Sequence, residues 1–113
     1  MAYQSFQELI AWQRAMDLAV EIYEFSRSFP NEEKFGLTSQ IRRAGVSVPS
    51  NIAEGHGRRT SKDFANFLWI ANGSLGEIET QALLAERLGF VSHETTSAIV
   101  DHCEEVGRIT RGL

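Results

Sequence analysis

The chain is poor in the residues that would cross-link it or place it in a membrane. It has one cysteine, Cys103, so no disulfide can form within the chain. Its 2 prolines and 9 glycines are too few for a collagen-like or low-complexity chain. No apolar run approaches the ~20 residues of a membrane-spanning helix, and the first residues lack the pattern of a signal peptide. We therefore expect a soluble, cytoplasmic protein with no membrane partner.

What is present is the composition of an ordinary globular protein. The chain has 113 residues, of which 42% are hydrophobic and 23% charged. This length suits a single domain over residues 1–113 and excludes a multi-domain enzyme. A domain of this size can fold alone, with a stability of about 5 to 10 kcal/mol.

Charge is distributed unevenly along the chain. Residues 34–62 contain six bases and one acid, a local charge of +5, within a chain whose net charge is −4. The remainder contains five bases and 14 acids, a charge of −9. This balance argues against a protein coated evenly with nucleic-acid contacts, because such domains carry an excess of Lys and Arg over one face. A local basic strip is still compatible with it.

The first predicted helix covers residues 6–29 and follows a capping box formed by Ser5 and Glu8. Its apolar residues fall on two faces at helical spacing. One face contains Leu9, Trp12, Met16, Ala19, Val20 and Tyr23. The other contains Ala11, Ala15, Leu18, Ile22 and Phe25, which we predict to form an oligomer interface, the alternative being a deeper position in the core of one subunit.

The second predicted helix covers residues 32–56, with Asn31 as its N-cap and Pro49 inside it. A polar stripe lies beside its apolar stripe and consists of Gln40, Arg43, Ser47, Asn51 and Glu54. Polar groups at the edge of a core need partners, because an unpaired buried group costs about 1 to 3 kcal/mol. We predict a structural hydrogen-bond network here, and a ligand site is the alternative.

Two more helices are predicted over residues 61–88 and 93–111, with Thr60 and Ser92 as N-caps and Gly89 after the third helix. Connections of a few residues make consecutive helices antiparallel neighbours. The predicted fold is therefore an all-α, up-down-up-down four-helix bundle. Small residues in the middle of the third helix, around Gly73 and Gly76, suggest close approach by a neighbouring helix.

The sequence offers no pattern typical of a catalytic or metal site. No two of the three histidines are spaced as metal ligands on one helix face. His102 and Cys103 are adjacent, so they point about 100° apart on a helix and cannot share a proton. The stretch from Gly55 to Gly57 lacks the lysine and hydroxyl of a phosphate loop. We therefore expect no cofactor, no metal and no enzyme activity.

Four bases form the candidate nucleic-acid contact. Arg42 lies opposite the apolar stripe of the second helix, and Arg58, Arg59 and Lys62 crowd the turn that follows. Phosphates can be held there by charge, and repetition around an oligomer would strengthen a weak site. The alternative is solvated charge paired with the acidic remainder of the chain.

Three stretches resemble a known family: FQELIAWQRAMDLAVEIY, LTSQIRRAGVSVPSNIAEGHGR and FANFLWIANGSLGEIETQALLAERLGF. They are similar to the four-helix-bundle proteins encoded in the intervening sequence of bacterial 23S ribosomal RNA genes. The resemblance covers about residues 6–111. It implies an antiparallel bundle that assembles into a homopentameric ring, with no assigned activity.

The same resemblance extends to the accessory variability determinant of diversity-generating retroelements, which shares the bundle and the pentamer and binds nucleic acid. That relative is strongly basic, whereas this chain is acidic overall. The resemblance implies a role in fold and assembly for the motif residues Gln40, Arg43, Ser47, Asn51, Glu54, Gly55, Gly73, Ser74 and Glu77. Our first hypothesis is a non-enzymatic oligomeric protein whose main partner is itself. The second is an accessory protein that binds RNA or DNA through the basic strip.

Overall fold

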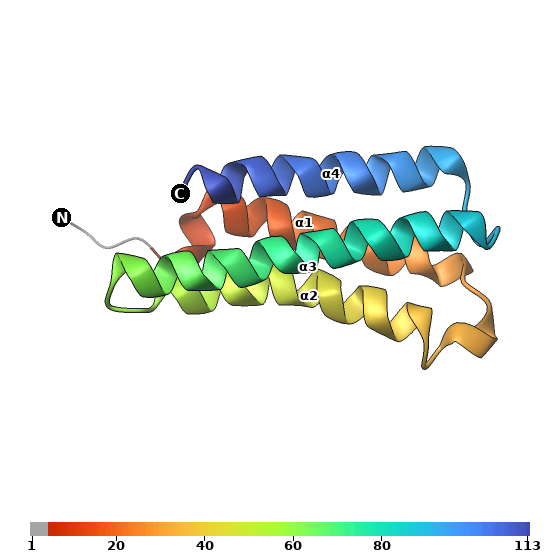
Figure 1. Ribbon diagram of the computed structural model, residues 1–113, viewed down its shortest axis with the longest axis horizontal. Helices are drawn as coiled ribbons and strands as arrows, with labels where there is room; N and C mark the ends of the chain where they lie inside the picture. The colour runs from red at the N-terminus through yellow and green to blue at the C-terminus, as the bar shows by residue number, and fades with distance from the viewer. Residues whose placement is uncertain (1–4) are drawn as a thin grey trace.

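The computed structural model describes residues 5–113, which contain four α-helices, three short 3-10 helices and no strand. The α-helices are α1 (Ile10–Phe25), α2 (Leu37–His56), α3 (Ser61–Arg87) and α4 (His93–Arg111). Consecutive helices run in opposite directions along a bundle of 50 × 25 × 19 Å (Figure 1). The predicted all-α class and alternating helix directions are therefore observed.

The four helices stand in a square in the order of the sequence. α1 packs against α2 and α4, and α3 packs against the same two helices. Within the described residues, the backbones of α1 and α3 do not approach each other closely, and neither do those of α2 and α4. α1 and α3 therefore occupy opposite corners of the bundle, and each helix has one side that faces away from the core.

α1 is shorter than the predicted helix over residues 6–29. Ser5 accepts a hydrogen bond from the backbone N–H of Gln7 at 3.2 Å, but it caps only the 3-10 helix η1 (Phe6–Glu8), which ends at the extended Leu9. At the other end, a 3-10 helix η2 (Ser26–Ser28) follows α1, and Phe29 is extended. Pro30 explains this second break, because the residue before a proline is disfavoured in helical conformation.

α2 begins five residues later than predicted. Residues Asn31–Glu33 form the 3-10 helix η3, and α2 starts after Gly36. Asn31 is therefore not the N-cap of α2. Gly36 is the N-cap residue, and the carboxylate of Glu33 satisfies the first N–H of the helix, because its Oε1 accepts a hydrogen bond from the backbone N–H of Leu37 at 3.0 Å. Pro49 lies inside α2, as predicted.

The ends of α3 and α4 follow the sequence signals closely. The Thr60 hydroxyl accepts from the N–H of Asp63 at 3.1 Å, and the Ser92 hydroxyl accepts from the N–H of Thr95 at 3.2 Å. Gly89 adopts a φ of +81°, which lets the chain leave α3 in a left-handed conformation. Both predicted caps and the predicted glycine stop are confirmed.

The residues predicted as an oligomer interface belong to the core of the subunit instead. Each of them is at most 8% exposed, and the set is Ala11, Ala15, Leu18, Ile22 and Phe25. They pack with the inward residues of the other helices in one hydrophobic cluster. The prediction was wrong because α1 has two apolar faces, and helical periodicity alone does not tell which one faces inward. No helix within residues 5–113 is long and apolar enough to span a membrane.

Candidate functional site

The other apolar face of α1 is the one that solvent reaches. Met16 is 40% exposed, Val20 59% and Tyr23 42%. Trp12 and Ala19 lie along the same side and are half-buried. We call this set the outer stripe of α1. Apolar side chains in a continuous row on a small protein are typical of an interaction surface.

The outer face of α3 is also apolar. Its exposed large side chains are Trp69, Ile70, Leu83 and Leu84, between 45% and 75% exposed. Gly73 and Gly76 lie among them, and a Cβ added at either position would meet no atom within 4 Å beyond the adjoining residues and backbone of α3 itself. The packing of the chain itself therefore does not require a glycine at either position. By contrast, a Cβ at Gly45 of α2 would lie 3.0 Å from Ile22 of α1.

Part of the predicted polar network of α2 is present. The Asn51 side chain donates to the carbonyl oxygen of Ser47 at 2.8 Å and to its hydroxyl at 2.9 Å. Ser74 of α3 donates to the Ser47 hydroxyl at 2.8 Å, which ties the two helices together. These short bonds between half-buried groups fit the structural role that we predict for Ser47 and Asn51.

The remaining three members of that stripe do not join the network. Gln40, Arg43 and Glu54 are all exposed. Gln40 has only a long 3.5 Å contact with Gln81 of α3, and Glu54 forms an ion pair with Arg58 at 2.7 Å. The partial burial expected for Arg43 and Glu54 is therefore not observed. The polar stripe lies farther from the core than its spacing on the helical wheel indicated.

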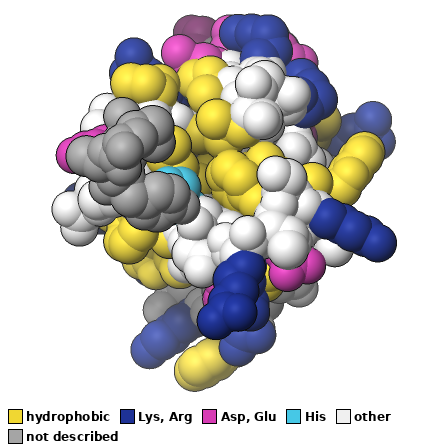
Figure 2. Space-filling model, turned by 90° about the vertical axis from the view of Figure 1, so that its left-hand side faces the viewer, with side chains coloured by type: hydrophobic (Ala, Val, Ile, Leu, Met, Phe, Trp, Pro, Cys, Tyr) yellow, Lys and Arg dark blue, Asp and Glu magenta, His cyan; other side chains and the backbone are white. Residues whose placement is uncertain are grey.

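The four bases of the predicted strip do not form one patch. Arg42 lies 14 residues before the end of α2 at His56, about 21 Å along the helix axis. Arg58 is paired with Glu54, whereas Arg59 and Lys62 make no ion pair within residues 5–113. Figure 2 views the end of the bundle that holds the α2–α3 turn, where Lys and Arg side chains are spread around the rim and hydrophobic ones gather in the middle.

Arg42 belongs to a different cluster at the opposite end of the bundle. There a groove of about 700 Å³ is lined by three bases, two aromatic residues and no acid. Its charged and aromatic residues are Tyr23, Lys34, Phe35, Arg42 and Arg43, and we call it the cationic groove. The groove was not predicted from the sequence, because Tyr23 comes from α1 and Phe35 from the turn before α2. The signal was present in the cation and aromatic residue that stand side by side at positions 34 and 35.

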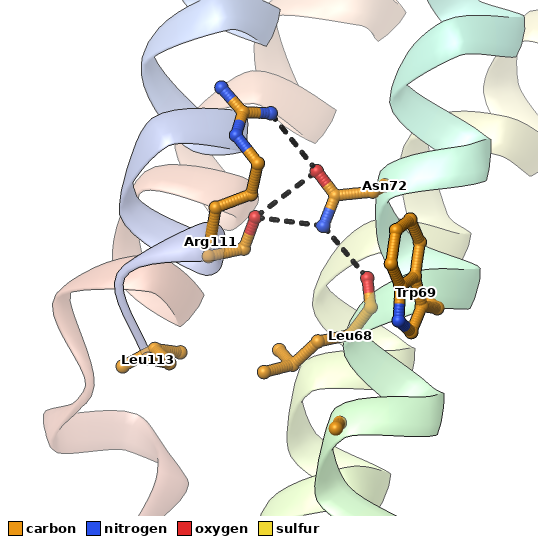
Figure 3. Close-up of a pocket in the computed structure, with 7 residues that line it drawn as sticks. Leu68, Trp69, Asn72, Arg111 and Leu113 are labelled. Carbon is orange, nitrogen blue, oxygen red and sulfur yellow. Dashed lines mark hydrogen bonds between the residues drawn. The ribbon is translucent and has the colours of Figure 1, made fainter.

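A second hollow of about 560 Å³ lies between the start of α3 and the end of α4 (Figure 3). Asn72 forms its polar wall: the side chain donates to the carbonyl of Leu68 at 2.9 Å and to the Thr110 hydroxyl at 3.1 Å. Arg111 donates to Asn72 Oδ1 at 3.5 Å. These bonds link α3 to α4, so the polar groups of this hollow have a structural role.

The described residues provide no reactive cysteine. Cys103 is 1% exposed, and burial raises the pKa of its thiol, with the charges of Glu79, Glu21 and Glu104 adding to the effect. A thiol with a raised pKa is a poor nucleophile and a poor metal ligand. His102 instead pairs with Glu21 of α1 at 2.6 Å and joins α4 to α1. Within residues 5–113, no three metal-ligating side chains come together.

The comparisons with known proteins identify related chains. The model of a family described as 23S rRNA-intervening sequence protein matches residues 7–112. A crystal structure of a protein with unknown function, from the S23 ribosomal protein family of Bacteroides thetaiotaomicron, superposes with a TM-score of 0.81 at 25% sequence identity. That match covers 91% of this chain and 96% of the other. No curated protein matches the chain.

Proposed function

The chain belongs to the 23S rRNA-intervening sequence protein family, whose function is unknown, and from this premise we propose that it acts as a non-enzymatic homo-oligomer, a ring built by contact between copies. The outer face of α3 is the observation that carries this proposal. That face exposes four large apolar side chains around two glycines that its own chain leaves uncovered.

Gly73 and Gly76 support a helix from another copy as the partner of this face. A glycine in the middle of a helix costs about 1 kcal/mol relative to alanine. Apart from the adjoining residues and backbone of α3 itself, no atom of the chain lies within 4 Å of where either Cβ would be, so alanine would fit at both positions. A helix of another copy that packs closely against this part of the α3 backbone would explain both glycines. Within the chain, Ile22 packs closely against Gly45 in this way.

The outer stripe of α1 is the surface that we assign to the neighbouring copy. It lies at the opposite corner of the square from α3, so the two apolar surfaces of one copy cannot cover each other. Contact between two different surfaces is head-to-tail, and such contacts close into a ring when the rotation between copies allows it. The number of five subunits rests on the family resemblance.

The absence of enzyme activity is part of the proposal. It is supported by the buried Cys103 thiol and by the structural use of His102 and Asn72. By contrast, the outer stripe of α1 and the outer face of α3 both expose large apolar side chains. Assembly is therefore the function that the arrangement favours most.

Light scattering coupled to size-exclusion chromatography tests this proposal at micromolar concentration. We expect a particle whose mass is a whole multiple of the chain mass, and a monomer for the double variant Gly73→Lys, Gly76→Lys. Neither lysine would clash within its own chain, because both positions open outward. Gly57→Lys, at the exposed end of α2, is the matched control and should keep the assembly. A monomeric wild type, or a double variant of unchanged mass, contradicts the proposal.

A further inference from the structure

The cationic groove differs in charge from the chain that carries it. The chain has a net charge of −4, yet the groove is lined by Lys34, Arg42 and Arg43 and by no acidic residue. The groove lies at the end of the bundle where α1 connects to α2, on the right in Figure 1. A concave surface lined by charge of one sign concentrates ligands of the opposite sign. The groove therefore suits an anion.

Two aromatic rings flank these bases. Phe35 is 90% exposed, more than any other large hydrophobic residue among those described, and its only ring partner there is Lys34, whose Nζ lies 5.5 Å from the ring centroid. Tyr23 is 42% exposed and carries the guanidinium of Arg42 at 4.6 Å from its ring centroid. A phenyl ring left in water beside a cation offers a flat surface on which a second flat group can stack. The groove therefore also suits an aromatic ligand.

Arg42 is held in place by the core beneath it. Its Nε donates to the Ser26 hydroxyl at 2.8 Å, and its Nη2 donates to the carbonyl of Tyr23 at 3.3 Å. Ser26 is 2% exposed and donates in turn to the carbonyl of Ile22 at 2.8 Å. A guanidinium fixed in this way loses little conformational freedom when it binds a phosphate. It has five N–H donors, so some remain for a ligand.

A nucleotide combines a flat aromatic base, which can stack on a ring, with a phosphate, which binds positive charge, so it matches both features of the groove. We propose that the cationic groove binds nucleotides as units of a single-stranded nucleic acid, with bases stacked on Phe35 and phosphates held by Lys34, Arg42 and Arg43. Single strands offer unstacked bases to such a surface, whereas a duplex keeps its bases inside. The groove volume of about 700 Å³ lies within the range of ligand sites, ~300–1,000 Å³.

This groove is not the basic strip predicted from the sequence. The two share only Arg42, and Arg58, Arg59 and Lys62 lie near the other end of α2. Lys34, Phe35, Arg42 and Arg43 all lie outside the outer stripe of α1, which shares only Tyr23 with the groove. A ring would strengthen binding to a long strand, because several grooves could engage the same molecule.

Fluorescence anisotropy with a labelled 15-nucleotide oligoadenylate tests the proposal at low salt. We expect binding that weakens with added salt and exceeds binding to a duplex of the same length. Phe35→Ala should weaken binding about tenfold without changing the salt dependence, because it removes stacking and no charge. Arg43→Gln should weaken binding and lower the salt slope by about one phosphate contact.

Arg108→Gln is the matched control, because it removes the same charge from an exposed residue in the last turn of α4, away from the groove. It should change affinity less than twofold. AMP as competitor distinguishes the two sources of the ligand: displacement identifies the free nucleotide, and failure to displace identifies the strand. Equal losses for Arg43→Gln and Arg108→Gln, an unchanged Phe35→Ala variant, or no binding at low salt would overturn the proposal. Light scattering on each variant keeps this result separate from a failure to assemble.

Discussion

The inward and outward sides of the helices contain the same kinds of residue, but those on the inward side are packed against other helices and those on the outward side are exposed. On the inward side, Gly45 and Gly55 lie against other helices, and Ile22 is fully buried. On the outward side, Gly73 lies in open space and Val20 is 59% exposed. The residue types alone therefore do not tell which surface is the core. The difference is visible only in what each side chain touches.

The largest effect that separates the two sides is expected on α1. Ile22→Ala should lower the free energy of unfolding by about 2 to 5 kcal/mol, because it leaves a cavity in a fully buried site. Val20→Ala should change the stability of the subunit by less than about 0.5 kcal/mol. Urea denaturation measures the free energy of unfolding of each variant, with its dependence on urea concentration fitted separately for each. Equal losses for the two variants would mean that both sides of α1 are packed within the subunit.

A second pair of variants should shift stability in opposite directions. A Cβ at Gly55 would lie 2.7 Å from Cβ of Phe67, so Gly55→Ala should cost about 1 to 3 kcal/mol. Gly73→Ala should stabilise the isolated subunit by about 0.5 to 1 kcal/mol, because alanine is the better helix former and nothing obstructs it. Thermal unfolding at a concentration where the subunit is dissociated tests the contrast. A loss of stability for Gly73→Ala would show that position 73 is packed.

The smallest expected effect concerns the carboxylate of Glu79, which lies on α3 and is half-buried. Burial raises the pKa of Glu79 above its ordinary value of 4.5, and the nearby charge of Glu104 adds to this. A carboxyl whose pKa is raised on folding opposes folding when it is ionised, so its cost appears as the pH rises through 4.5 and beyond. Glu79→Gln should therefore raise the melting temperature slightly at pH 7, and the gain should vanish below pH 4.5.

Measurement of the same variant below pH 4.5 is the control, because the Glu79 carboxyl is then largely protonated whether the chain is folded or unfolded. A gain for Glu79→Gln that persists at pH 4 would point to packing of the amide and not to the charge.

Much of the fold could be predicted from local signals. Thr60 and Ser92 cap the starts of two helices, and Gly89 ends one. Each acts on residues only a few positions away, so these signals are visible in the sequence. The start of α2 was harder to predict, because its first N–H is bonded by the side chain of Glu33 and not by that of Asn31, the expected N-cap. The inward side of α1 could not be assigned because both of its sides are apolar, and only the positions of α2 and α4 decide between them.

The candidate sites were less predictable because they join distant segments. Tyr23 and Arg42 meet across two helices, and nothing in the sequence between them records that contact. Arg42 was grouped with Arg58 because both lie in one basic segment of the sequence, although most of the length of α2 separates them in space. Ser47 and Asn51 were expected to share a hydrogen-bond network, and the bond between them is observed because they are one helical turn apart.

The contact between Glu21 and His102 joins the first helix to the last. During synthesis, the inward side of α1 leaves the ribosome well before α4 exists to cover it, at ~5–20 residues per second. The nascent chain therefore exposes Leu18 and Ile22 for several seconds, and the bundle closes only after α4 has emerged. Chaperone demand should accordingly last from the emergence of α1 until that of α4.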